Sequence, residues 1–400
     1  MCPVAPRATA AIASLRLTLA DLVRAHGDAY RRAHRLARVQ TLALRAIAAC
    51  RTALLGGRRE TCDHCGAERI TYNSCRNRHC PACQSQASAR WIEARRAELL
   101  PIPYFHVVFT LPHALNPLAQ GNPRVLYTLL FRAAAETLLT VGRDPRHLGG
   151  TIGVTAILHT WSQTLTDHLH VHCLVTSGAL SRDRTRWIRG RATFLFPVKA
   201  LSVVFRAKYL AGLQRAFTEG QLTFAAGTAP LADAGRFAAL LAQLRGTPWV
   251  VYAKRPFGGP AQVLKYLGRY THRIAISNAR LIRLVDGVVQ FRWKDYAERG
   301  RPKVMALGVE EFLRRFLLHV LPRGFVRIRH FGLLANRHRY AAIIRARHLL
   351  GQTAPSASAA ALPTADRDRT CPVCRQGHCQ VVEILRPLVA ARVPPAWNTS

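Results

Sequence analysis

Three histidines, His168, His170 and His172, alternate along the apolar segment 168–175. Successive side chains of a β-strand point to opposite faces, so the three imidazoles share one face of a predicted strand and the apolar residues between them share the other. A single alternating pair is more simply explained as two half-buried histidines. Three imidazoles side by side favour a metal site.

Most of the eleven cysteines fall into clusters with the spacing of metal ligands. Two Cys-x-x-Cys pairs flank a short basic loop, and two such pairs complete a tetrahedral site for structural zinc. The expected ligands are Cys62, Cys65, Cys80 and Cys83. Cys75 and His79 are alternate ligands, which leaves open a different set of four or, with Cys50, a second ion.

A further Cys-x-x-Cys pair, Cys371 and Cys374, lies near the C-terminus, with His378 and Cys379 close behind it. We interpret this pair as a second candidate zinc site. One pair is a weaker signal than two, and a redox or non-functional pair is the alternative. The segment 352–365 before it is rich in Ala, Ser, Pro and Thr, which is typical of a flexible linker.

Two tyrosines, Tyr266 and Tyr270, lie four residues apart in a predicted helix that begins at Ala261. They share one helix face, and Lys265 and Arg269 form a parallel basic pair beside them. An aromatic pair at this spacing is more often part of a hydrophobic core. Together with a metal acting as a Lewis acid, however, a tyrosine hydroxyl can attack a phosphodiester and become joined to DNA.

The charge of the chain predicts a polyanionic partner. It has 58 Lys and Arg against 21 Asp and Glu, for a formal net charge of +37, and only six of the basic residues are lysine. The planar guanidinium of arginine matches phosphate oxygens, so we expect salt-dependent DNA binding. Clustered thiols imply a reducing compartment, and we expect a cytoplasmic, nucleoid-associated protein without a secretory signal or a membrane span.

The elements that must position these residues follow the order strand, helix, strand, strand. A strand is predicted at 105–111, an amphipathic helix at 121–142 and a strand at 151–159, just before the histidine strand. This order predicts an α+β fold with helices on one face of a sheet. Further predicted elements are two helices within 8–55 that break at Gly27, helices within 199–245, a strand at 249–253, a hairpin turning at Asp286-Gly287, and a helix at 309–320.

Several longer motifs occur in a fixed order along the chain. They are NSCRNRHCP at 73–81, PYFHVVFTLP at 103–112, HVH at 170–172, AKRPFGGP at 253–260, YLGRYTHR at 266–273 and WKDY at 293–296. With these motifs the chain resembles the rolling-circle HUH transposases of the insertion sequence 91 family, of the two-tyrosine type. The resemblance implies an RRM-like antiparallel sheet with helices, the HUH endonuclease core, preceded by a helical and zinc-binding N-terminal domain.

The resemblance also implies roles for individual residues. His170 and His172 become ligands of a catalytic Mg²⁺ or Mn²⁺ ion, and Tyr266 and Tyr270 become the candidate nucleophiles. His168 is in register to be the third ligand.

The alternatives for that third ligand are His159 and an acidic residue brought in by the fold. An all-imidazole set would also accept zinc. The expected DNA-binding residues are Lys265, Arg269 and Lys294, and the implied substrate is the single-stranded end of a transposon.

We therefore expect a transposase that nicks single-stranded DNA at the ends of its element, forms a 5′-phosphotyrosine and transfers the strand. Residues 1–98 are expected to form the helical and zinc-binding DNA-recognition domain, 99–345 the catalytic domain, 346–367 a linker, and 368–400 a zinc-knuckle-like tail. A plasmid replication initiator or relaxase is the alternative enzyme. A non-catalytic zinc DNA-binding protein is the alternative from another class.

Overall fold

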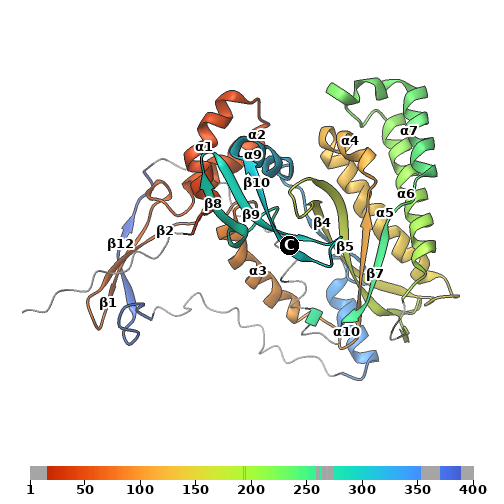
Figure 1. Cartoon of the computed structure of the whole chain (residues 1–400). Coiled ribbons are helices and arrows are strands. Elements are labelled where there is room, and N and C mark those ends of the chain that lie inside the picture. Colours follow the sequence, from red (N-terminus) through yellow and green to blue (C-terminus); the bar gives the residue numbers. More distant parts are fainter. Residues whose placement is uncertain are drawn as a thin grey trace, which may run out of the picture.

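The computed structural model describes residues 16–191, 193, 195–257, 262–263, 268, 274–352 and 370–388. Within these residues the chain forms three antiparallel sheets with helices packed around them (Figure 1). Two of the sheets have three strands each, and the third, which carries the histidines, has six. This arrangement confirms the expected α+β class.

The six-stranded sheet is built from segments spread over more than half of the chain. Its strands are β3 (Tyr104–Thr110), β4 (Thr151–Trp161), β5 (Asp167–Leu180), β6 (Trp187–Arg189), β7 (Val251–Phe257) and β11 (Ile328–Gly332). Their order is β11-β4-β5-β3-β7, and β6 pairs with β5 outside this path. The predicted histidine strand is thus β5, which lies at the centre of the sheet between β4 and β3.

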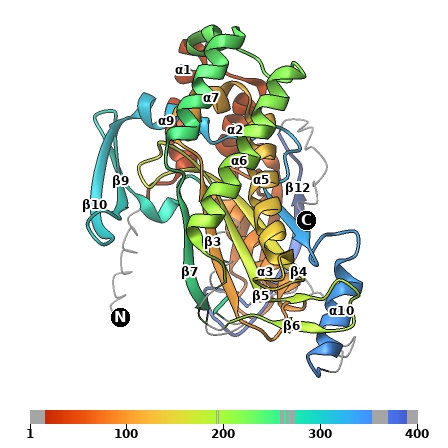
Figure 2. The same cartoon turned by 90° about the vertical axis from the view of Figure 1, so that its right-hand side faces the viewer.

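Helices cover one face of this sheet. They are α4 (Asn116–Gly121), α5 (Pro123–Arg143), α6 (Val198–Thr218) and α7 (Ala234–Gly246), with the short helices η2 (His113–Leu115) and η3 (Ala226–Ala232). Seen from the helical side, α5 and α6 lie across the strands and α7 lies above them (Figure 2). The helices within 199–245 are therefore confirmed, with the break near Pro230 as expected.

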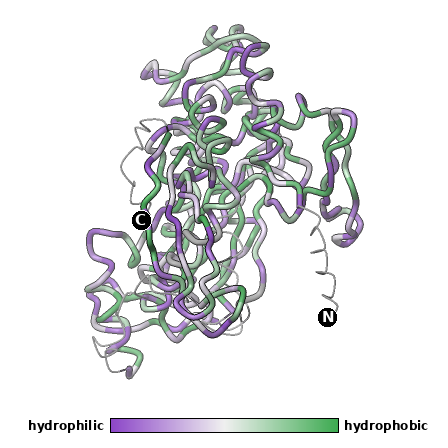
Figure 3. The backbone as a smooth tube through the Cα atoms, turned by 90° about the vertical axis from the view of Figure 1, so that its left-hand side faces the viewer, coloured by the Kyte–Doolittle hydropathy of each residue, from purple (hydrophilic) through white to green (hydrophobic). Residues whose placement is uncertain are grey.

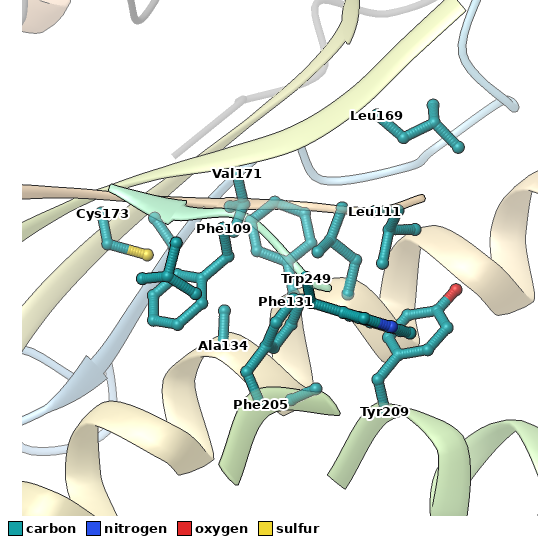
Figure 4. Packing of buried hydrophobic residues seen from close by; sticks show 14 of the residues in the cluster. Phe109, Leu111, Phe131, Ala134, Leu169, Val171, Cys173, Phe205, Tyr209 and Trp249 are labelled. Carbon is teal, nitrogen blue, oxygen red and sulfur yellow. The ribbon is translucent and has the colours of Figure 1, made fainter. Parts of the chain in front are cut away.

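The main hydrophobic core lies between these helices and the apolar face of the sheet. Phe109 and Val171 of the sheet pack against Phe131 of α5 and Phe205 of α6 (Figure 4). The apolar residues that alternate with the histidines all enter this core. The prediction of a strand with one polar and one apolar face is confirmed, because the apolar residues between the histidines all enter the core beneath α5 and α6.

α5 is long and apolar enough to cross a membrane by length and composition alone. Of its most apolar window, however, 61% is buried inside the protein. Leu130, Phe131 and Ala134 of this helix belong to the core under the sheet. The apolar character of α5 is thus explained by its position in the core.

Hydrophilic stretches alternate with apolar ones along the molecule when it is viewed from the opposite side (Figure 3).

A second core joins the N-terminal helices to a later part of the chain. Its elements are α1 (Leu19–Ala33), α2 (Arg38–Ala49), η4 (Asn278–Arg280), β8 (Leu281–Val285), β9 (Val288–Asp295), β10 (Arg301–Gly308) and α9 (Val309–Leu318). The predicted hairpin is confirmed: Asp286 and Gly287 both have positive φ, 48° and 73°, as a type I′ turn requires. The expected break at Gly27 is wrong, because this buried glycine lies inside α1 and the helix ends at Ala33.

The smallest sheet joins two strands that follow α2 to the C-terminal part of the described chain. It consists of β1 (Gly57–Cys62) and β2 (Glu68–Tyr72) together with β12 (Cys379–Leu385), in the order β12-β1-β2. Figure 1 shows it projecting from the body of the molecule beyond α3 (Pro81–Arg96). The remaining helices are η1 (Ala53–Leu55) and α10 (Arg339–Leu349).

Candidate metal centres and active site

Three buried histidines gather on the face of the six-stranded sheet that α5 and α6 do not cover. They are His159 of β4 and His170 and His172 of β5, and one nitrogen of each lies within 4.8 Å of the others. His159 stands opposite His170 in the antiparallel register of β4 and β5, so the two side chains point to the same side. Three imidazoles arranged in this way can bind one divalent ion.

Hydrogen bonds fix the orientation of two of these rings. His170 donates from Nδ1 to the carbonyl oxygen of His168 at 2.7 Å, which leaves Nε2 as the nitrogen that can face a metal. The Nδ1 of His172 lies 2.8 Å from Nε2 of His106, on the neighbouring strand β3. Such contacts from outside the ligand set fix the tautomer and the direction of a metal-binding histidine.

Burial favours the neutral, metal-binding form of His170 and the neutral form of the adjoining His106. Burial and the nearby His168 lower the pKa of His170 to about 3. Burial together with the charge of Lys254 lowers the pKa of His106 to about 3 as well. The ring of Trp161 stacks on His159 at a centroid distance of 4.7 Å and closes one side of the group. A set of neutral nitrogen donors therefore fits a divalent ion.

His168 lies beside this group, with its ring centroid 4.7 Å from that of His170, but outside the set of three nitrogens that lie within 4.8 Å of one another. Its Nδ1 is 3.4 Å from Nε2 of His113, and the group of three that could share an ion includes His159 instead. His168 is near the end of β5, where the chain leaves the centre of the sheet. Of the two histidines that the sequence offered as third ligand, the structure places His159 beside His170 and His172.

The two candidate nucleophiles, Tyr266 and Tyr270, lie outside the described residues, as do Lys265 and Arg269. Three residues of the same segment are described, Gln262, Val263 and Gly268. Val263 is fully buried in an apolar cluster with Leu174, which shares the histidine face of the sheet. Gly268 accepts a hydrogen bond at its carbonyl from the hydroxyl of Ser88 in α3, at 3.3 Å.

The edge strand β7 adds two exposed side chains to the histidine face. Tyr252 is opposite Val108 of β3, which in turn is opposite His172, so all three share one face. Lys254 is opposite His106 in the same register. Tyr252 is 52% exposed, which is unusual for a large aromatic residue on a sheet. An exposed aromatic ring beside a lysine is the arrangement that stacks and holds single-stranded nucleic acid.

The remaining predicted DNA-binding residue, Lys294, is exposed on β9, in the sheet formed by β8, β9 and β10. Its neighbours in that sheet are partly basic, and Lys303 is held by Asp295 at 2.8 Å. Lys294 therefore lies on a different sheet from the histidines.

The expected zinc ligands are divided between two groups of four cysteines. The first group lies where α2, the basic loop and α3 meet, and consists of Cys50, Cys75, Cys80 and Cys83. The sulfur atom of Cys83 lies 3.6 Å from the sulfur of Cys50 and 3.6 Å from the sulfur of Cys75. Four ligands about 2.3 Å from a tetrahedral zinc ion lie about 3.8 Å from one another, so this spacing fits zinc.

The second group joins the first Cys-x-x-Cys pair to the last one. Its members are Cys62, Cys65, Cys371 and Cys374. The sulfur of Cys374 lies 3.7 Å from that of Cys62, and the sulfur of Cys371 lies 3.7 Å from that of Cys65. These separations are far longer than a disulfide bond of about 2.05 Å and again fit tetrahedral zinc.

The structure thus does not bring together the four cysteines that we expected to share one ion. Each Cys-x-x-Cys pair is a unit, as its spacing predicts, but the partner of each pair comes from elsewhere in the chain. His79, an expected alternate, is buried and accepts a hydrogen bond at Nε2 from the backbone amide of Leu321, at 3.3 Å. The spacing left open that Cys75 and Cys50 belong to another ligand set, and in the structure they form a group of four with Cys80 and Cys83.

Comparisons with known proteins find two matching families. Residues 22–111 match a family described as "Transposase zinc-binding domain", and residues 153–341 match one described as "Putative transposase". The chain is 50% identical over 393 residues to "Putative transposase y4qJ" of Sinorhizobium fredii, covering 96% of this chain and 98% of that protein.

A second relative is the "Transposase for insertion sequence element IS801" of Pseudomonas savastanoi pv. phaseolicola. It is 31% identical over 296 residues, which cover 72% of this chain and 68% of that protein. No solved structure matches the chain.

Proposed function

The chain belongs to the insertion sequence 91 family of transposases and has its zinc-binding domain, and on this premise we propose that it cleaves single-stranded DNA through a tyrosine. In this proposal Tyr266 or Tyr270 is the nucleophile, and His159, His170 and His172 hold a Mg²⁺ or Mn²⁺ ion. The substrate is the single-stranded end of the element, and the protein works on the bacterial nucleoid in the cytoplasm.

The observation that carries the proposal is the location of the buried histidine group. The histidines occupy the sheet face into which Val263, three residues before Tyr266, is packed. Gly268, which stands between the two tyrosines in sequence, contacts α3 on that side as well. Val263 and Gly268 therefore support the proposal that the tyrosine segment lies on the histidine side of the sheet.

The reaction is a transfer of one phosphoester bond. The tyrosine hydroxyl loses its proton and its oxygen attacks phosphorus, so that a new O–P bond forms while the bond from phosphorus to the 3′ oxygen breaks. The 3′ oxygen leaves with a proton as a free hydroxyl, and the 5′ end stays on the tyrosine. Because the energy of the phosphoester is kept, the reverse attack by another 3′ hydroxyl rejoins the strand without ATP.

The side chains of this site divide the remaining work. A bound divalent ion supplies Lewis-acid polarisation of a phosphodiester oxygen. His106 holds the ring of His172, and the backbone of β5 holds that of His170. Tyr252 and Lys254 at the edge of the same face bind the incoming strand by stacking and by charge. Residues 1–98 recognise the DNA, while residues 99–345 cleave it.

The test is formation of a covalent complex. Labelled single-stranded ends of the element, incubated with the protein and Mn²⁺, should give a labelled protein band that survives denaturation. The double variant Tyr266→Phe/Tyr270→Phe should give none, because phenylalanine has no hydroxyl. Tyr340→Phe is the matched control, since Tyr340 is 81% exposed on α10, and this variant should keep the full yield. An unchanged yield in the double variant would show that another residue attacks.

A further inference from the structure

We propose that Cys62, Cys65, Cys371 and Cys374 bind a structural zinc ion of their own, which fastens the C-terminal segment 370–388 to strands β1 and β2. The paired cysteines are 312 and 306 residues apart in sequence. This ion is separate from the one that suits Cys50, Cys75, Cys80 and Cys83. It would act as a clamp between the two ends of the chain.

The surroundings of the sulfur atoms are those of thiolates. Backbone amides donate hydrogen bonds to sulfur at 3.4 Å from His64 to Cys62, from Val373 to Cys371 and from Gly377 to Cys374. Each amide lies two or three residues after its cysteine, so both Cys-x-x-Cys loops turn in the same way. Amide donors stabilise negative charge on sulfur, which is the form that binds zinc.

The two loops also interlock through their backbones. The amide of Asp63 donates to the carbonyl oxygen of His378 at 3.0 Å, and the amide of His378 donates to the carboxylate of Asp63 at 2.7 Å. A side chain at Gly377 would place its Cβ 2.4 Å from Cβ of His64 and 2.7 Å from the sulfur of Cys62. The last loop therefore approaches the first so closely that only glycine fits at this position.

The sheet that carries this cluster has almost no other apolar interior, and its buried Glu60 is paired with Arg58 and Arg69. Its large apolar side chains point to solvent: Ile70 is 52%, Val382 55% and Ile384 70% exposed. The buried residues that pack together here are Cys62, Cys371 and Cys379. A unit this small without an apolar core folds only when a metal or a disulfide holds it. Because the described cysteines form no disulfide, a metal must supply that stability.

The other cysteine group lies in a different environment. Cys50, Cys80 and Cys83 belong to the second core, among apolar residues of α1 and α9. Cys65 of the clamp, in contrast, is exposed. The two sites should therefore load and empty independently, so that one can be removed while the other is kept.

The first experiment counts thiolate-bound metal in the full chain. The protein is loaded with Co²⁺, whose tetrahedral thiolate complexes absorb visible light strongly, and zinc content is measured in parallel. The wild type should hold two tetrathiolate ions. Cys371→Ser/Cys374→Ser should lose half of the thiolate absorption and one zinc ion. Cys379→Ser is the matched control, because Cys379 is buried in the same cluster but outside the set of four, and it should keep both ions.

The second experiment tests the clamp itself. A specific protease site is inserted between residues 353 and 369, outside the described residues, and the full-length protein is cut there. In the wild-type background the fragment from residue 370 onward should stay bound to the rest through size-exclusion chromatography. In the Cys371→Ser/Cys374→Ser background it should separate. Gly377→Ala should weaken retention of the fragment while Cys50, Cys75, Cys80 and Cys83 keep their ion.

Two results would overturn the clamp. One is a double-serine variant that keeps both thiolate-bound ions, and the other is a wild-type fragment that separates after cleavage with zinc present. Loss of an ion in Cys379→Ser would show that the ligand set is different. None of these measurements depends on DNA cleavage, so they are independent of the proposed tyrosine chemistry.

Discussion

His159 and His170 stand directly opposite each other on adjacent antiparallel strands, and both are buried on the same face of the sheet. The ligand group therefore spans two strands: β5 supplies His170 and His172, and β4 supplies the third imidazole. A position in register on the partner strand is as close as the next alternate position on the same strand. This relationship supports His159 as the third ligand in the proposed site.

His159→Ala should abolish tight binding of Mn²⁺ and DNA nicking together. A ligand is lost, so the fall in metal affinity should exceed the 10- to 100-fold that is typical for removing an outer hydrogen-bonding partner. His168→Ala should bind Mn²⁺ within a few-fold of the wild type, because His168 lies outside the group of three nitrogens and its Nδ1 is 3.4 Å from Nε2 of His113. Calorimetric titration of both variants with Mn²⁺ checks this pair. The reverse order of effects would make His168 the ligand.

His106→Ala should weaken metal binding without removing a ligand. The ring of His106 holds His172 through a 2.8 Å contact, and loss of such a partner costs roughly 10- to 100-fold in metal affinity. His106→Gln keeps a polar group at this position and should recover part of the affinity. Mn²⁺ titration and the melting temperature of the metal-free protein are measured together. Equal affinities for the alanine variant and the wild type would remove His106 from this positioning role.

Tyr252→Ala and Lys254→Ala should each weaken binding of single-stranded DNA, but in different ways. Stacking on an aromatic side chain contributes about 1–3 kcal/mol per base, so Tyr252→Ala should lower the affinity roughly 5- to 150-fold. Lys254→Ala removes one phosphate contact and should reduce the salt slope of log K by about 0.7.

Fluorescence anisotropy at several salt concentrations distinguishes these two effects. Lys208→Ala is the matched control, because Lys208 lies on α6 at the helical side of the sheet and pairs with Glu136 at 3.9 Å. It should leave the affinity and the slope unchanged. If Lys208→Ala and Lys254→Ala lowered the DNA affinity equally, binding would depend on the total charge of the protein and not on the histidine face.

Phe205→Ala should destabilise the catalytic sheet. The ring of Phe205 is fully buried. Its centroid lies 4.9 Å from the ring centroid of Phe109 of β3 and 5.3 Å from that of Trp249. Removal of a buried phenylalanine ring typically lowers the free energy of unfolding by about 3–5 kcal/mol. Val203→Ala on the same helix is 56% exposed and should change it by less than about 0.5 kcal/mol. Urea denaturation of the two variants, followed by tryptophan fluorescence, measures the difference.

Local patterns predicted individual strands and turns well. The alternation of histidine and apolar residues indicated β5 with the correct face buried, and the Asp286-Gly287 pair indicated the hairpin turn. These features depend on neighbouring residues alone. The predicted helix break at Gly27 was wrong because it depends on the rest of the protein. Gly27 is buried inside α1, where packing outweighs the helix-breaking tendency of glycine.

The metal sites depend on contacts between distant segments, and the sequence could show only parts of them. Spacing identified each Cys-x-x-Cys pair, but nothing local indicates that Cys62 meets Cys374 across 312 residues. Likewise, the choice between His159 and His168 requires the register of β4 against β5. The sequence indicated only that His106 lies in a strand. Its contact with His172 depends on the pairing of β3 with β5.

The most direct test of the account is to identify the residue that becomes attached to DNA. Wild-type protein is allowed to react with an unlabelled single-stranded element end in Mn²⁺, the complex is digested with protease and nuclease, and the peptide that carries a nucleotide is sequenced by mass spectrometry. We expect a nucleotide linked to Tyr266 or Tyr270, and no such peptide from His159→Ala. A nucleotide attached to any other residue would contradict it.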